Sequence, residues 1–125
     1  MLGNSVNLLH GNVENTHLPH QSIDLISIQF LLHEVPMQNS YNILKESYRL
    51  LSPNGTIAIL DFNTNKLHNL IQKNPLKIWA FELTEPHMQE YYDTNMTEFL
   101  ESVGFTNIIQ KNNDPRNSIW IARKL

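Results

Sequence analysis

The side chains with the clearest chemical potential are His33 and Glu34, which directly follow an apolar run. Histidine suits general acid–base catalysis because its unperturbed pKa lies near neutrality. A structural role is the alternative, in which His33 caps or packs on the following helix. The zinc motif H-E-x-x-H is excluded because position 37 is Met37, and the pair His17 and His20 makes no zinc site either. The sequence contains no Cys, which excludes a thiolate nucleophile and any Cys-ligated metal.

A second set of candidates lies in residues 63–92, a segment interrupted by Pro75 and Pro86 that we interpret as broken helices. Such a segment can supply an aromatic wall for a small molecule. Its aromatic side chains include Trp79, Phe81, Tyr91 and Tyr92. The alternative is that these rings simply cover one face of a sheet.

Composition limits the classes of protein to which the chain can belong. Its 125 residues, with a net charge of −3, fit one globular domain. No apolar run approaches the ~20 residues of a membrane helix, and the N-terminus does not resemble a secretory signal. Nine Lys and Arg against twelve Asp and Glu, without a basic cluster, argue against nucleic-acid binding. We therefore expect a cytoplasmic protein with no membrane or nucleic-acid partner.

The first half of the chain alternates strand, helix and strand. Apolar and β-branched runs predict strands at residues 6–10, 22–32 and 56–61. Between the last two, apolar residues at spacings of three and four predict a helix from residue 37 to 51, stopped by a tight turn at 52–55. This is a βαβ unit, and its crossover should be right-handed.

The C-terminal third predicts a helix followed by an antiparallel hairpin. Met96, Phe99, Leu100 and Val103 form one apolar stripe. Asp93 or Thr94 is the expected N-cap, and Gly104 stands where a glycine commonly ends a helix. Two β-rich runs, residues 105–110 and 118–123, flank the turn-rich segment 111–116.

Several short motifs in this order resemble the second half of a class I S-adenosylmethionine-dependent methyltransferase. They are Gly11-Asn12-Val13-Glu14, Leu18-Pro19, Ser22-Ile23-Asp24-Leu25-Ile26, Leu32-His33-Glu34-Val35-Pro36, Leu51-Ser52-Pro53-Asn54-Gly55-Thr56 and Gly104-Phe105. Within the family, Thr84-Glu85-Pro86-His87 through Tyr91-Tyr92 is more similar to the enzymes that methylate small molecules.

The resemblance implies an α/β fold, a partial Rossmann-like methyltransferase sheet built from strands three to seven. In the complete family the strand order is three, two, one, four, five, seven, six, and only the seventh strand is antiparallel. The cofactor lies at the carboxyl ends of the strands. Residues 1–62 would form the second half of the cofactor-binding core, 63–92 a lid over the substrate and 93–125 the last helix and closing hairpin.

The resemblance also assigns roles to individual residues. Cofactor binding falls to Asn12, Val13, Gln29 and Phe30, with an ordinary Gly-Asn turn and a buried strand end as the respective alternatives. His33 would be the catalytic base, needed only where the methyl acceptor must lose a proton. Contacts to a small-molecule acceptor fall to Asp61, Glu85, His87 and Tyr91. No metal site is expected.

The sequence departs from the family because nothing in it corresponds to strands one and two. The four glycines include no G-x-G pair, so the loop that approaches the methionine end of the cofactor is missing, and so is the acid that binds both ribose hydroxyls. These units amount to on the order of 60 residues. We therefore expect a C-terminal part of a small-molecule methyltransferase, with an incomplete S-adenosylmethionine site and weak or no activity alone.

Without strand one, the apolar edge of strand four is expected to find another partner. Either strand three moves in beside it, or a second copy or another chain covers it. The alternative function is therefore a non-catalytic protein that pairs through this edge. A nicotinamide-dependent enzyme is disfavoured because it also needs a glycine-rich loop.

Overall fold

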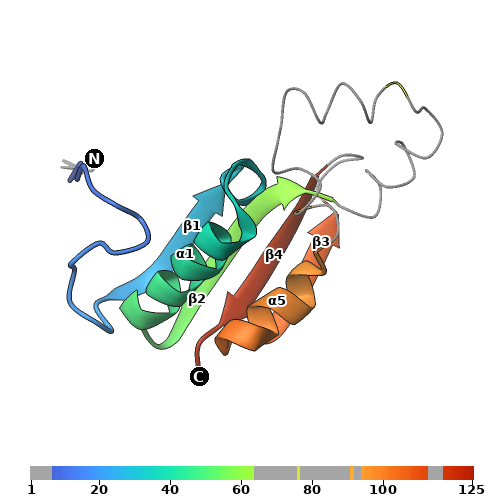
Figure 1. Ribbon diagram of the computed structural model, residues 1–125. Coiled ribbons are helices and arrows are strands. Elements are labelled where there is room, and N and C mark those ends of the chain that lie inside the picture. The colour runs from blue at the N-terminus through green and yellow to red at the C-terminus, as the bar shows by residue number, and fades with distance from the viewer. Residues whose placement is uncertain (1–6, 64–75, 77–90, 92–93, 113–116) are drawn as a thin grey trace, which may run out of the picture.

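The computed structural model describes residues 7–63, 76, 91, 94–112 and 117–125. Its elements in chain order are β1 (Ile23–Gln29), the 3-10 turn η1 (Leu32–Glu34), α1 (Met37–Leu50), β2 (Leu51–Phe62), α5 (Met96–Val103), β3 (Thr106–Asn112) and β4 (Asn117–Arg123). Figure 1 shows them as one mixed sheet with two helices packed against it.

The four strands lie in the order β1-β2-β4-β3. β1 and β2 are parallel, whereas β4 runs antiparallel to both β2 and β3. The expected sequence of strands four, five, seven and six is thereby confirmed, together with the α/β fold class. The parallel βαβ unit and the C-terminal hairpin are confirmed as well.

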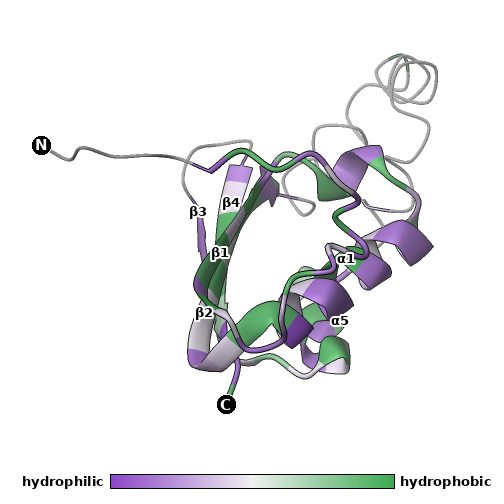
Figure 2. Cartoon of the chain, turned by 90° about the vertical axis from the view of Figure 1, so that its left-hand side faces the viewer, coloured by the Kyte–Doolittle hydropathy of each residue, from purple (hydrophilic) through white to green (hydrophobic). Residues whose placement is uncertain are grey.

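Both described helices, α1 and α5, lie on the same face of the sheet (Figures 1 and 2). Alternate residues of β2 and β4 are buried beneath them, because successive side chains of a strand point to opposite faces. The core of this layer includes Ile57, Ile59, Trp120, Ala122, Leu44, Leu100 and Phe105. The opposite face of the same strands is half-buried or exposed.

Helix α1 ends one residue before the predicted boundary, and the predicted tight turn at 52–55 is wrong. Strand β2 already begins at Leu51 and includes these residues, with Asn54 at φ 66°. The backbone N–H of Asn54 donates to the Lys124 carbonyl, and the Lys124 N–H donates to the Gly55 carbonyl. These bonds to the residue directly after β4 hold the segment in the sheet. Local turn propensity does not contain such an interaction between distant residues.

The sequence predicted the C-terminal end of α5 correctly but not its N-cap. The N-cap is Asn95, whose side chain accepts from the Glu98 N–H at 3.2 Å, and neither Asp93 nor Thr94 has this role. Gly104 ends the helix at φ 121° as expected, in a conformation that favours glycine.

The predicted strand at residues 6–10 does not form within its described part, residues 7–10. A strand is stable only where its N–H and C=O groups pair with a neighbour, and these residues have no described strand beside them. They also do not move in beside β1, whose described ladder is to β2 alone. That alternative is therefore wrong, while coverage of β1 by a second chain stays a prediction.

Candidate active site

His33 lies directly beyond the carboxyl end of β1. The strand ends where Phe30 takes a positive φ of 53° while its N–H still donates to the Leu60 carbonyl. The chain then turns into η1, which carries His33 inward until only 4% of its surface is exposed. The sharp turn after β1 thus places an imidazole over the end of the neighbouring strand β2.

A completely buried carboxylate, Asp61, meets this imidazole from β2. His33 Nδ1 lies 2.8 Å from Asp61 Oδ1, which also accepts from the Phe62 backbone N–H at 2.8 Å. An ionised carboxylate only accepts hydrogen bonds, so this contact places the imidazole proton on Nδ1. Among the described residues, Asp61 Oδ2 has no hydrogen-bond partner. The geometry fixes both the orientation and the tautomer of His33.

Aromatic rings enclose the pair on two sides. Phe62 packs edge-on against the His33 ring, with centroids 4.7 Å apart, and Tyr91 does so at 6.2 Å. The Tyr91 hydroxyl donates to the Phe62 carbonyl at 2.8 Å. Burial, and secondarily the charge of Asp61, raises the pKa of Tyr91. Tyr91 is therefore a neutral hydrogen-bond donor that holds its ring against the pair.

The other ring nitrogen of His33, Nε2, lies close to a second carboxylate. It lies 3.7 Å from Glu34 Oε1, and the Glu34 side chain is 56% exposed. These two atoms form an ion pair only when the imidazole is protonated. With the proton held on Nδ1 by Asp61, Nε2 is the atom that can accept a proton from an acceptor molecule.

The four residues expected to bind the cofactor are divided between two environments. Val13 and Gln29 line one cavity. The Asn12 side chain accepts from the Glu14 N–H at 2.8 Å, as in the alternative of an ordinary turn. The Phe30 ring lies 5.9 Å from that of Phe62. Asn12 and Phe30, which adjoin Val13 and Gln29 in the chain, do not line this cavity.

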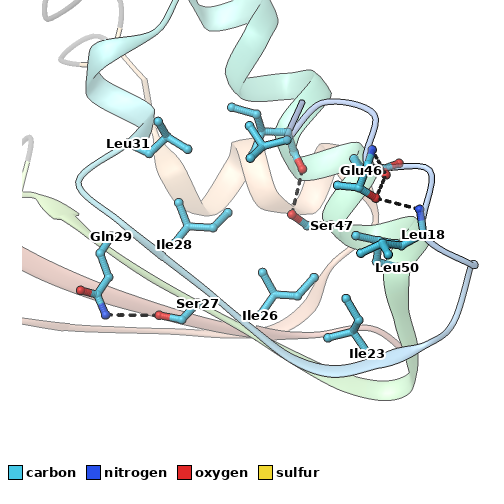
Figure 3. Close-up of a pocket in the computed structure, with 13 residues that line it drawn as sticks. Leu18, Ile23, Ile26, Ser27, Ile28, Gln29, Leu31, Glu46, Ser47 and Leu50 are labelled. Atoms are coloured by element: carbon cyan, nitrogen blue, oxygen red, sulfur yellow. Dashed lines mark hydrogen bonds between the residues drawn. The ribbon is translucent and has the colours of Figure 1, made fainter. Parts of the chain in front are cut away.

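The cavity lies between β1, α1 and residues 13–18, and has a volume of about 500 Å³ (Figure 3). Its walls are mainly apolar and include Ile23, Ile26, Ile28, Leu31, Ile43 and Leu50. Ser27, Glu46 and Ser47 contribute polar groups. It extends along β1, from its first residue to its carboxyl end.

An ion pair between the buried Glu46 and the partly exposed Arg49 holds residues 16–18 over this cavity. Glu46 Oε2 accepts from both the N–H and the hydroxyl of Thr16, at 2.8 and 2.6 Å. Arg49 binds both oxygens of Glu46 and also donates to the Leu18 carbonyl. The Arg49 hydrogen bonds, assisted by those of Thr16, lower the pKa of Glu46 to about 2. Glu46 is therefore a charged structural anchor at neutral pH.

Sequence reasoning predicted His33, Asp61 and Tyr91 separately, and the structure brings these three together. Glu85 and His87 lie outside the described residues. Phe62 was missed, although its position next to Asp61 at the end of a strand was a usable signal.

No described helix is long and apolar enough to cross a membrane.

Comparison with known proteins identifies the family. A profile described as "Methyltransferase domain" matches residues 2–59. The demethylmenaquinone methyltransferase of Lactobacillus johnsonii is 32% identical over 110 residues, covering 74% of this chain and 44% of that protein. The chain belongs to the class I S-adenosylmethionine-dependent methyltransferase family. The enzyme of the same name from Listeria welshimeri is 39% identical over 57 residues, covering 46% of this chain and 23% of that protein.

Solved structures of methyltransferases share the fold of this family member. An S-adenosylmethionine-dependent methyltransferase from Methanosarcina mazei superposes with a TM-score of 0.65 at 20% identity, covering 92% of this chain and 65% of the other. One from Archaeoglobus fulgidus gives 0.66 at 16% identity, with 98% and 70% covered. The chain therefore spans less than half the length of the curated relatives it matches and about two thirds of these two structures.

Proposed function

We propose that this methyltransferase chain provides the acceptor-binding and proton-accepting part of an enzyme that methylates a small molecule. The observation that carries the proposal is the buried contact of 2.8 Å between His33 Nδ1 and Asp61 Oδ1. It lies at the carboxyl ends of two parallel strands, where open α/β sheets bind their ligands. A buried histidine held by a carboxylate at this place is the arrangement expected of a positioned base.

In this proposal the protein supplies a positioned base. His33 accepts the acceptor's proton on Nε2, and the resulting imidazolium is stabilised by the Asp61 carboxylate. Asp61 acts through His33 and is a positioning residue, in place of the substrate contact expected from the sequence. Tyr91, through its ring and its bond to the Phe62 carbonyl, limits the movement of the imidazole.

The residues present fit only part of the cofactor. S-adenosylmethionine supplies an electrophilic methyl group, and Val13 and Gln29 at the cavity are the residues of this chain proposed to hold its adenine end. The ribose and methionine ends have no counterpart here, because the sequence has no G-x-G pair and nothing that corresponds to the family's strand two with its terminal acid. Losing two charge-assisted hydrogen bonds of ~1.5–3 kcal/mol each weakens binding by roughly two to four powers of ten.

The proposed acceptor is a small aromatic molecule with a ring hydroxyl, of the demethylmenaquinone class. The names of the curated relatives support this class. The rings of Phe62, Tyr91 and His33 pack on one another, and this aromatic surrounding of the proposed base favours a planar ring as its neighbour. A ring hydroxyl also gives His33 a proton to accept. The cytoplasmic location remains a prediction.

A non-catalytic role is the second candidate, and the open edge of β1 favours it. This apolar strand pairs on one side only within the described residues. A chain whose only role is to pair with another protein would need this strand edge but not the His33–Asp61 pair. Substitution of the pair therefore separates the two functions.

The test measures transfer of a labelled methyl group from S-adenosylmethionine to a demethylmenaquinol. The 125-residue chain is combined with the N-terminal part of the Lactobacillus johnsonii relative, up to the start of its match. His33→Asn should lower the rate by about 10²- to 10⁴-fold. His20→Asn changes an exposed histidine in the turn before β1 and should leave the rate unchanged. An equal rate in both variants, or no transfer by the wild type, would contradict the proposal.

A further inference from the structure

The backbone of Phe30 has a conformation that bulky residues rarely adopt. Its φ of 53° lies in the left-handed region, which strains any residue other than glycine. Its N–H donates to the Leu60 carbonyl at 2.8 Å and so keeps this end of β1 attached to β2. Strained residues persist where the surrounding structure holds them, and they are concentrated at functional sites. The strain at Phe30 therefore raises the question of what its side chain does.

The positive φ determines where the Phe30 ring lies. Ile26 and Ile28 line the cavity from β1, and every second side chain of a strand points to the same face. A regular strand would therefore direct the Phe30 ring into that cavity. Phe30 does not line it, and its ring instead lies 5.9 Å from that of Phe62, with the two planes inclined by 60°. The turn thus directs the ring towards the aromatic residues around the proposed base.

The Phe30 ring is accessible, whereas the rings that follow it are more enclosed. Among the Phe, Tyr and Trp residues that the structure describes, Phe30 is the most exposed, at 38%. Phe62 is partly buried, and its centroid lies 4.7 Å from that of the buried His33 ring. The rings of Phe30, Phe62 and His33 therefore form a row from the surface to the proposed base. An exposed aromatic face at the outer end of this row is suited to bind a planar ring.

We propose that the Phe30 side chain binds the planar ring of the methyl acceptor and determines a preference for aromatic over saturated acceptors. The inference rests on the proposed function, because that function places the acceptor at His33. The adenine of the cofactor is planar as well. However, Val13 and Gln29, the residues proposed to hold it, line the cavity from which the Phe30 ring is absent. The acceptor is therefore assigned to Phe30 in place of the cofactor expected from the sequence.

The test measures the binding of two small alcohols to the 125-residue protein by NMR titration. 2-Naphthol has a planar ring and a ring hydroxyl, whereas decahydro-2-naphthol retains the hydroxyl but has no aromatic face. The wild type should bind 2-naphthol about 2- to 10-fold more tightly, which is the range that one aromatic contact provides. Neither cofactor nor methyl transfer is involved in this measurement.

Phe30→Leu keeps an apolar side chain and the same backbone strain but removes the aromatic face. The variant should bind both alcohols with equal affinity, and its affinity for decahydro-2-naphthol should stay within about twofold of the wild-type value. Phe99→Leu is the matched control, because it makes the same change on α5, where the partly buried Phe99 ring lies 6.1 Å from that of Tyr41. This control should retain the preference for 2-naphthol. Adenosine, added as a competitor, should not displace 2-naphthol from the wild type.

Three results would overturn the inference: no binding of 2-naphthol by the wild type, a preference that Phe30→Leu retains, or displacement of 2-naphthol by adenosine. A purely structural role of Phe30 gives the second result, because it changes both affinities without changing their ratio. Failure of the proposed function is recognised separately. A preference that depends on Phe30, together with methyl transfer that does not depend on His33, would refute the proposed base and leave the ring-binding role of Phe30 intact.

Discussion

At the scale of single residues, the His33–Asp61 pair determines the chemistry that the site can perform. A buried carboxylate that fixes the tautomer of a histidine makes the other ring nitrogen a directed base. Both residues were identified from the sequence as chemically relevant, but their pairing was not. They are 28 positions apart in the chain, and their contact depends on how β1 and β2 align in the sheet. Local patterns do not contain that alignment.

Asp61→Asn tests the positioning role. The amide retains the size of the side chain but lacks the charge that stabilises a histidinium. It can also turn its NH₂ group, a donor, towards Nδ1 where the carboxylate presents only acceptors. The variant chain is assayed together with the N-terminal part of the Lactobacillus johnsonii relative. A general base contributes ~10²- to 10⁴-fold, so kcat should fall by at most this factor while KM for the acceptor changes little. Steady-state kinetics measures both. A rise in KM with unchanged kcat would instead support the substrate contact expected from the sequence.

Glu46→Gln tests the anchor of residues 16–18. Hydrogen bonds from Arg49 and Thr16 hold the pKa of Glu46 at about 2, below the ordinary value of 4.5. The stabilisation is therefore complete above pH 4.5 and is lost as the pH falls towards 2. At pH 7, Glu46→Gln should lower the free energy of unfolding by about 1–3 kcal/mol, with a smaller difference near pH 2.

Urea unfolding at the two pH values measures the Glu46 contribution. Glu34→Gln is the control, because its side chain is 56% exposed and it should shift stability by no more than about 0.5 kcal/mol. If the free energies of unfolding of Glu46→Gln and the wild type differed by the same amount at both pH values, the role of Glu46 as a charged anchor would be contradicted.

At the scale of elements, the turn after α5 depends on glycine. Gly104 has φ 121°, and an added Cβ would lie 3.2–3.4 Å from the ring of Tyr48. Gly104→Ala should lower the free energy of unfolding by about 1–3 kcal/mol. Gly11→Ala is the matched control, because an added Cβ there meets nothing within 4 Å. Urea midpoints compare the two, and equal stability would show that the strain at position 104 is relieved by local adjustment.

The elements themselves could largely be predicted from the sequence, because each has a strong period of its own. The apolar stripe of α1 and the β-branched runs of β1, β2 and β4 are local properties. The errors occur where a distant partner decides. Residues 52–55 join β2 through the backbone bonds of Asn54 and Gly55 to Lys124. Residues 7–10 form no strand, because none of the described strands lies beside them. The N-cap of α5 is Asn95, whereas the sequence predicted Asp93 or Thr94.

At the scale of the whole molecule, the described residues form a sheet that helices cover on one face only. Helices α1 and α5 cover one face, while the opposite face and the outer edge of β1 retain exposed apolar residues such as Leu25 and Ile109. The matched relatives are more than twice as long as their overlap with this chain. We infer a division of labour in which the acceptor and base sites lie in this chain and most of the cofactor contacts come from another segment.

Calorimetric titration of the 125-residue protein with S-adenosylhomocysteine tests this division most directly. Without the glycine-rich loop and the ribose carboxylate, the chain alone should bind roughly two to four powers of ten more weakly than when it is combined with the N-terminal part of the Lactobacillus johnsonii relative. Binding by the chain alone at low micromolar Kd, unchanged by the added polypeptide, would contradict the account.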